Sequence, residues 1–161
     1  MNKSFNELNI NQSIVMALKK QNITTPTGIQ ETSIPFALEN KDIIAEAHTG
    51  TGKTLAFLIP IFEKINLEKR EMQAIILAPT HELVVQIESQ IKLLATNSHM
   101  DIKSLSIMGE SNIEKQIKKL KEIKPHIIVG SPGRILDLIK KRKITAHTIN
   151  CLLYTSDAAD E

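Results

Sequence analysis

Residues 47–62 read "AHTGTGKTLAFLIPIF", and this stretch decides the fold. It continues from residues 42–47, "DIIAEA", a short apolar run typical of a buried strand. Gly50 and Gly52 let backbone N–H groups turn toward an anion, because no Cβ stands in the way. The apolar residues after Lys53 repeat as in a helix, whose first turn offers free N–H donors and a positive dipole end. A loop of this kind between a strand and a helix predicts a site for the phosphates of a nucleotide.

Two side chains at the end of this loop carry the expected chemistry. The Lys53 ammonium can neutralise the charge of β- and γ-phosphates, and the Thr54 hydroxyl can join the coordination shell of Mg²⁺. The usual pattern begins with Gly where this chain has Ala47, which is also small. A glycine-rich turn without function is the alternative, and the agreement of motif and context disfavours it. His48 is expected to be an exposed loop histidine rather than a catalytic group.

Composition bounds the class of protein. A chain of 161 residues with 42% hydrophobic composition has the size of one domain. The net charge of +2 neither demands nor excludes a nucleic-acid partner, and 3% aromatic residues are too few for a base-stacking platform. A lone cysteine, Cys151, suits a reducing cytosol. No secretory leader and no apolar run of roughly 20 residues is visible, so we expect a cytoplasmic protein without a membrane partner.

Short apolar runs alternate with helical patterns along the chain. The runs are apolar on both faces, as in a parallel sheet covered by helices, and they fall at residues 42–47, 73–78, 102–108, 126–130 and 149–154. Helical periodicity fills most of the intervals between them, at residues 81–95, 111–123 and 133–141. The alternation predicts an α/β fold, a parallel β-sheet flanked by helices. Ligands of such sheets bind at the carboxyl ends of the strands.

Three further stretches narrow the class: "NITTPTGIQ" (22–30), "APTHEL" (78–83) and "VGSPGR" (129–134). Together with "AHTGTGKT" they resemble, in order, the first RecA-like domain of DEAD-box ATP-dependent RNA helicases. The resemblance runs from about Phe5 to about Leu153. It implies an incomplete RecA-like P-loop NTPase domain that binds ATP and Mg²⁺ and contacts RNA without reading its sequence. It also implies a place in an enzyme that couples ATP hydrolysis to the unwinding of RNA duplexes.

The stretch at residues 22–30 resembles the family's adenine-reading Q motif. The Gln30 amide can both donate and accept hydrogen bonds, which would discriminate ATP from GTP. In the family, an aromatic residue 17 positions before the motif stacks on the base, and Phe5 holds that position here. Two alternatives stay open: Gln30 as an ordinary amide on a helix surface, and Phe5 as an apolar plug that docks the N-terminal segment.

The other stretches resemble motifs that contact RNA phosphates. "APTHEL" is similar to the family's "PTREL", and its Thr80 could also cap the next helix. "VGSPGR" is similar to "TPGR", in which Ser131 keeps the hydroxyl, Gly133 allows close backbone approach and Arg134 opens a helix aimed at phosphate. A plain strand-to-helix turn is the alternative for this last stretch. The lysines between 115 and 124 are expected to form the solvated face of a helix.

Two positions depart from the family pattern. His81 stands where the family usually has Arg, which removes a permanent positive charge. "MGES" stands where the family has a Gly-Gly pair, so that Gly109 is kept and Glu110 replaces the second glycine. A carboxylate facing a phosphate would repel it, so this contact is expected to be weaker or shifted.

The resemblance assigns roles residue by residue. Lys53 and Thr54 are the expected catalytic residues, and Thr54 is the expected metal ligand. The residues expected to bind ATP are Phe5, Thr25, Gln30, His48, Thr49, Gly50, Thr51, Gly52, Lys53 and Thr54. The residues expected to bind RNA are Pro79, Thr80, Gly109, Ser131, Gly133 and Arg134.

The end of the chain leaves the family pattern. The family's Asp-Glu pair, which binds Mg²⁺ and positions the attacking water, should fall at residues 155 and 156. The sequence has Thr155 and Ser156 there, and its aspartates come later, as Asp157 and Asp160. A two-residue slip moves a side chain by about 6–7 Å along an extended chain, too far for a carboxylate to stay on its metal. A catalytic role for Asp157 or Asp160 is therefore doubtful.

Three explanations of residues 155–161 remain: a degenerate motif, a solvated acidic terminus, or a frame that was cut and closed with foreign residues. The abrupt end of the resemblance favours the third. The expected organisation is a helical segment with the Q motif (1–40), a truncated ATP-binding domain (41–154) and a tail unlike the family (155–161). Besides an RNA helicase fragment, the sequence leaves open an ATP- and RNA-binding module without turnover and a P-loop ATPase that acts on DNA.

Overall fold

The computed structural model describes residues 3–156, which divide into two compact units. The first unit contains the described residues up to Lys64 together with residues 93–100. The second unit contains residues 65–92 and 101–156. The domain boundaries expected from the sequence stay a prediction.

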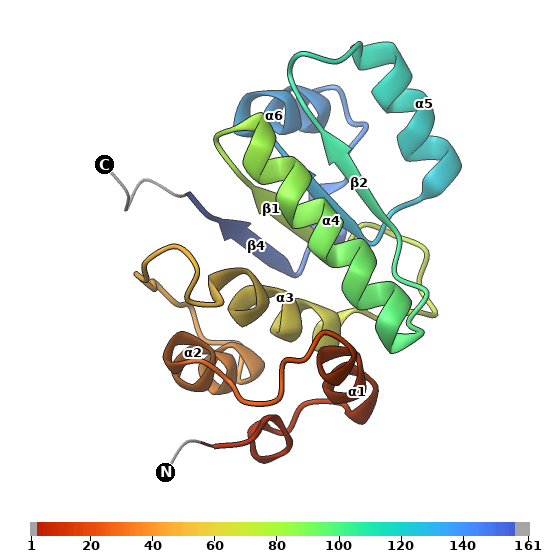
Figure 1. Ribbon diagram of the computed structural model, residues 1–161. Coiled ribbons are helices and arrows are strands. Elements are labelled where there is room, and N and C mark those ends of the chain that lie inside the picture. The colour runs from red at the N-terminus through yellow and green to blue at the C-terminus, as the bar shows by residue number, and fades with distance from the viewer. Residues whose placement is uncertain (1–2, 157–161) are drawn as a thin grey trace. The chain divides into compact units, whose positions relative to one another are not determined.

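Helices and one 3-10 turn build the first unit (Figure 1). They are η1 (Phe5–Leu8), α1 (Gln12–Lys20), α2 (Gly28–Leu38) and α3 (Lys53–Lys64). The Asn11 side chain accepts a hydrogen bond from the Ser13 N–H at 2.9 Å, so Asn11 caps α1 as its residue type predicts. Helices α2 and α3 pack against each other, and η1 contacts both α1 and α2. The residues with the lowest exposure include Ile14, Leu18, Ile34, Leu58 and Phe62.

The segment at residues 42–47 corrects one prediction. Its apolar pattern predicts a strand, but residues 41–48 have no regular structure, and the Ile44 side chain is fully exposed. A strand forms only when a neighbouring chain satisfies its backbone N–H and C=O groups, and no described strand pairs with this segment. The apolar pattern shows that the segment could be buried in a sheet. It does not show whether a neighbouring strand is present to pair with it.

A four-stranded parallel sheet forms the second unit. The strands are β1 (Ala74–Leu77), β2 (Ser104–Ile107), β3 (Ile127–Gly130) and β4 (Cys151–Tyr154), in the order β2-β3-β1-β4. Strands β1 to β4 are linked through α4 (His81–Ser98), α5 (Ile113–Ile123), α6 (Pro132–Lys140) and the turn η2 (Ala146–Thr148) (Figure 1). This confirms the predicted α/β fold with a parallel sheet flanked by helices. No helix among residues 3–156 has both the length and the apolar character to cross a membrane.

Helices α5 and α6 bury apolar side chains against the sheet. Leu120 of α5 and Leu138 of α6 belong to one core cluster with Ile75, Leu105 and Ile128 of the strands. Burying one such side chain contributes about 1.5–3 kcal/mol. The lysines of α5 are exposed, which confirms that their run is the solvated face of an amphipathic helix.

The register of the sheet aligns the carboxyl ends of its strands. Leu77 pairs with both Gly130 and Tyr154, and Gly130 also pairs with Ile107. All four strands therefore end level with one another. The segments that follow them, residues 78–80, 108–112, 131–134 and 155–156, are called the carboxyl edge below.

Candidate functional site

The loop at residues 47–54, called the phosphate loop below, adopts the backbone conformation that its glycines allow. Gly50 and Gly52 have φ angles of 79° and 82°, in the left-handed region that favours glycine. The Thr51 hydroxyl donates to the His48 carbonyl at 2.6 Å, and Lys53 Nζ donates to the Ala47 carbonyl at 3.3 Å. Helix α3 begins at Lys53. The loop therefore folds onto the start of a helix, the kind of position at which backbone N–H groups bind anions.

Gln30 joins this loop to the start of α2. Its side chain is only 1% exposed, so it is not a surface amide. Its Nε2 donates to the Gly52 carbonyl, and its Oε1 accepts from the Thr27 N–H, both at 3.0 Å. A Cβ on Gly52 would stand 2.3 Å from Gln30 Nε2 and 3.0 Å from the Thr27 hydroxyl. The residue predicted to read adenine thus lies against the predicted phosphate site, and only glycine fits between them.

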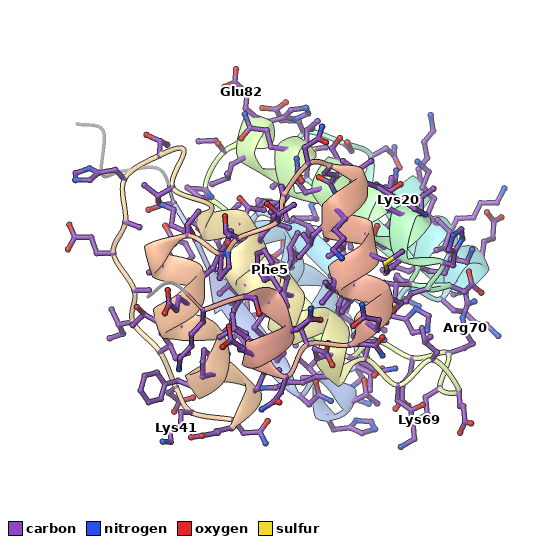
Figure 2. The ribbon with its side chains drawn as sticks, turned by 60° about the horizontal axis from the view of Figure 1, so that its bottom comes forward. Phe5, Lys20, Lys41, Lys69, Arg70 and Glu82 are labelled. Atoms are coloured by element: carbon purple, nitrogen blue, oxygen red, sulfur yellow. The ribbon has the colours of Figure 1, made fainter. Side chains whose placement is uncertain are left out.

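Phe5 lies in η1 and is 2% exposed (Figure 2). Since η1 contacts α1 and α2, this burial fits the docking of the N-terminal segment. Thr25 is exposed in the turn before α2. Stacking of Phe5 on a base and contact of Thr25 with a nucleotide stay predictions.

The residues of the first unit fit nucleotide phosphates better than they fit a magnesium ion. Two left-handed glycines lie directly before the helix start at Lys53, an arrangement that suits the binding of phosphate. Thr54 is half-buried in the first turn of α3 and offers a single hydroxyl. Among residues 3–156, no group of three His, Cys, Asp or Glu side chains is arranged to hold a metal.

The end of β4 carries hydroxyls instead of carboxylates. The Thr155 N–H donates to the Leu77 carbonyl at 3.0 Å, which extends the pairing of β4 with β1 by one residue. Thr155 and Ser156 therefore occupy the strand end at which the family pattern requires Asp and Glu. Asp157 and Asp160 lie outside the described residues. The described chain does not complete the predicted Mg²⁺ shell.

The residues predicted to bind RNA lie in three segments of the carboxyl edge. Pro79 and Thr80 follow β1 and are exposed. The Thr80 hydroxyl accepts from the Leu83 N–H at 3.2 Å, which confirms that it caps α4. A Cβ on Gly109 would lie 3.9 Å from the Ser131 hydroxyl, so the segments after β2 and β3 are neighbours. A Cβ on Gly133 would meet no atom within 4 Å, which leaves its backbone open to approach.

Arg134 is turned toward the loop at residues 108–112. Its guanidinium donates to the Gly109 carbonyl at 2.7 Å, to the Ser111 carbonyl at 2.8 Å and to Gln116 Oε1 at 2.8 Å. Gln116 Nε2 in turn donates to the Met108 carbonyl at 2.8 Å. The sequence predicts that Arg134 points toward a phosphate. In the structure, its guanidinium donates hydrogen bonds to this loop and holds it in place.

Two residues that help to shape the carboxyl edge, Gln116 and Gly130, lie outside the residues assigned a role by the sequence motifs. Gln116 is 6% exposed and lies on the apolar side of α5 between Ile113 and Leu120, where a polar residue signals a buried hydrogen bond. A Cβ on Gly130 would stand 2.2 Å from the Ile107 carbonyl, so only glycine permits the close pairing of β3 with β2. Its place at the end of an apolar run is the signal that could have identified it.

The chemistry-bearing loops and the fold match a known family. A family model described as DEAD/DEAH box helicase matches residues 27–154. The chain belongs to this family. Two solved DEAD box structures have the same fold as this chain. The crystal structure of a DEAD box protein from the hyperthermophile Methanococcus jannaschii has a TM-score of 0.87 and 36% identity, over 96% of this chain and 42% of its own. Dbp5 of S. cerevisiae, bound to RNA and ADP BeF3, has a TM-score of 0.83 and 31% identity, over 94% and 38%.

Relatives in this helicase family cover the chain along its length. The DEAD-box ATP-dependent RNA helicase CshA of Streptococcus pneumoniae is 46% identical over 157 residues, which are 98% of this chain and 29% of the relative. CshA of Bacillus subtilis is 41% identical over 161 residues, 100% of this chain and 32% of the relative. The chain thus spans about a third of the length of these curated relatives.

Proposed function

We propose that this chain is the part of an ATP-dependent RNA helicase that binds ATP through its phosphate loop and RNA through its carboxyl edge. The observation that carries the proposal is the buried Gln30 side chain, which bonds to the loop carbonyl of Gly52. This hydrogen bond joins the side chain predicted to bind adenine to the loop predicted to bind phosphate. The RNA bound to Dbp5, a relative of the same fold, supports RNA as the second ligand.

In this proposal, residues of the first unit hold the nucleotide. The first N–H groups of α3 and the Lys53 ammonium face the phosphates, and the Gln30 amide distinguishes adenine from guanine. ATP, when bound, supplies a phosphoanhydride bond whose hydrolysis the helicase family uses. In this proposal, Gln30 contacts the base while its side chain stays hydrogen-bonded to Gly52. Binding of adenine is thereby coupled to the conformation of the phosphate loop.

At the carboxyl edge, contacts go to phosphate and sugar rather than to base edges. The exposed hydroxyl of Thr80, the open backbone of Gly133 and the loop held by Arg134 provide donors for a sugar–phosphate chain. The edge therefore binds RNA with little regard to sequence. The logarithm of affinity should fall with the logarithm of salt concentration with a slope of about −0.7 for each phosphate neutralised.

We further propose that the chain as given binds both ligands with little turnover. Thr155 and Ser156 stand where the positioned carboxylates belong, and loss of a general base typically lowers a rate by about 10²- to 10⁴-fold. Unwinding of RNA duplexes is proposed for a helicase of the length of the curated relatives, of which this chain spans about a third.

An ATPase assay with and without single-stranded RNA, together with binding titrations of both ligands, tests whether the chain binds ATP and RNA with little turnover. The expected result is saturable binding of both ligands with turnover close to background. Robust turnover stimulated by RNA would contradict the binding-only proposal and leave the ligand assignment intact.

A competition assay separates RNA from DNA as the nucleic-acid ligand. A labelled RNA of ten nucleotides is displaced by unlabelled RNA or by DNA of the same sequence. RNA is expected to compete better, because 2′-hydroxyl groups add contacts that DNA lacks. Equal displacement by both would favour the DNA-dependent ATPase that the sequence left open.

A further inference from the structure

The two departures from the family pattern face each other across the carboxyl edge. His81 is the first residue of α4, and Glu110 lies in the loop after β2. His81 Nδ1 stands 3.9 Å from Glu110 Oε2, within reach of an ion pair when the imidazole is protonated. The two side chains are 53% and 86% exposed, so both are open to solvent and to a ligand.

Both members of the pair stand on backbone that is held in place. The Thr80 cap fixes the first turn of α4, directly before His81. Arg134 binds the carbonyls on either side of Glu110, those of Gly109 and Ser111. Hydrogen bonds therefore hold the backbone beside each member of the pair.

Other charged groups stand beside the pair in the sequence or are bonded to its loop. Arg134 is the cation fixed to the loop of Glu110, and its donors already serve backbone carbonyls and Gln116. Glu82 follows His81 on α4, and Glu114 stands in the first turn of α5. Since the donors of Arg134 are already engaged, protonation of His81 supplies a positive charge that would balance Glu110.

The charge of Glu110 matters because of its place. It directly follows Gly109, whose added Cβ would lie 3.9 Å from the Ser131 hydroxyl. Its partner His81 directly follows Thr80. Gly109, Ser131 and Thr80 are all among the residues proposed to meet RNA phosphates. A bare carboxylate at this place repels phosphate, whereas a carboxylate paired with an imidazolium does not. Histidine is the side chain whose charge changes between pH 5 and 8. The protonated ring would also present its other N–H to a phosphate oxygen.

We propose that His81 and Glu110 form a proton-dependent switch on RNA backbone binding. With His81 protonated, the pair is neutral and admits a phosphate; with His81 neutral, Glu110 repels it. The inference rests on the proposed RNA-binding function of the carboxyl edge. It makes this edge responsive to pH in a way that an arginine at position 81 and a glycine at position 110 would not.

The test measures affinity for a fluorescent single-stranded RNA at pH 6 and pH 8, at one ionic strength. The wild-type chain should bind about two- to fivefold more tightly at pH 6, the range expected of an exposed ion pair. Glu110→Gln should bind more tightly than the wild type at pH 8, because the carboxylate that repels phosphate is gone. His81→Arg should bind at both pH values as the wild type does at pH 6, because the charge of arginine does not change in this range.

His147→Gln is the matched control, because His147 is an exposed histidine of η2 in the same unit. It should keep the wild-type pH ratio. If His81→Arg binds RNA with an unchanged pH ratio, or if Glu110→Gln gains no affinity at pH 8, the switch is wrong and the RNA site stands. If no variant binds RNA at either pH, the proposed RNA function fails and the switch fails with it.

Discussion

At the scale of single residues, Gly52 connects the two halves of the proposed nucleotide site. Its φ angle is in the left-handed region, and its missing Cβ makes room for the buried Gln30 amide. The motif predicted the glycine from the phosphate side. The contact with Gln30 was not predictable, because the two residues are 22 positions apart and meet only after α2 and α3 pack.

Replacing Gly52 should therefore damage both folding and binding. Gly52→Ala places a Cβ 2.3 Å from Gln30 Nε2 and forces a left-handed conformation that costs about 1–2 kcal/mol. We expect a lower unfolding midpoint in urea and at least about a tenfold loss of ATP affinity, which corresponds to 1.4 kcal/mol. Gly28→Ala is the control, since a Cβ there meets nothing within 4 Å. Equal loss in both variants would contradict the argument.

Replacing Gln30 tests the adenine assignment. Gln30→Ala removes the bonds to Thr27 and Gly52 as well as the proposed contact with the base. Affinity for ATP should fall, and the preference for ATP over GTP should disappear in a competition titration. A variant that binds both nucleotides weakly but keeps the preference would mean that Gln30 supports the loop without reading the base.

We expect His126 to make the stability of the second unit depend on pH. The ring is fully buried at the start of β3, and its Nδ1 accepts from the Lys103 N–H at 3.0 Å. Its Nε2 has no hydrogen-bond partner among the described residues. Burial, and then the positive charge of Arg70 (Figure 2), lower the pKa of His126, an effect that Asp101 partly opposes.

The sign of this effect follows from proton binding. Between the lowered folded pKa of His126 and its ordinary value of 6.5, the unfolded chain binds more protons, so stability falls as pH drops through this window. Urea unfolding should show the wild type losing stability from pH 7.5 to pH 5.5. His126→Gln should flatten this loss, and the exposed His147→Gln should leave it unchanged. An equal slope in all three proteins would rule out His126 as the cause.

At the scale of elements, the loop between β2 and α5 is organised by a side chain from α6. Arg134 donates to two loop carbonyls and to Gln116, which itself holds the Met108 carbonyl. These partners lie 18 to 25 positions before Arg134, so the spacing of "SPGR" could not reveal them. The sequence located the residue at the right edge and did not predict its direction.

Loss of Arg134 should loosen that loop. Arg134→Ala leaves the Gln116 carbonyl oxygen without its donor and should destabilise the chain by about 2 kcal/mol, as expected for hydrogen bonds from a charged group. Hydrogen exchange should rise at residues 108–112, and RNA affinity should fall indirectly. Arg142→Ala, at an exposed position after α6, is the control. Unchanged exchange in the loop together with lost RNA binding would instead favour direct phosphate contact by Arg134.

The strands show where apolar pattern is sufficient and where it is not. Residues 73–78, 102–108, 126–130 and 149–154 each contain an observed strand, because each finds a parallel neighbour in the sheet. Residues 42–47 carry the same kind of pattern and stay irregular and exposed. Period and composition select segments that can be strands, and the pairing that decides the matter is not local.

At the scale of the whole molecule, the family and the α/β fold were predictable from four short motifs in order. Those motifs are short because phosphate chemistry demands particular residues at fixed spacing around a strand end or a helix start. The direction of Arg134, the burial of Phe5 and the pairing of His81 with Glu110 depend on segments brought together by folding. The same limit applies to turnover, since Thr155 and Ser156 occupy the end of β4 without carboxylates.

The central claim is that the loop at residues 47–54 binds ATP. Titration with a fluorescent ATP analogue, with ATP and GTP as competitors, tests it on the wild type, Lys53→Ala and Lys64→Ala. Lys64 lies at the opposite end of the same helix, so it controls for loss of a positive charge. The account predicts saturable binding to the wild type and Lys64→Ala, stronger competition by ATP than by GTP, and at least about a tenfold loss in Lys53→Ala. Equal affinity of all three proteins for the analogue would contradict it.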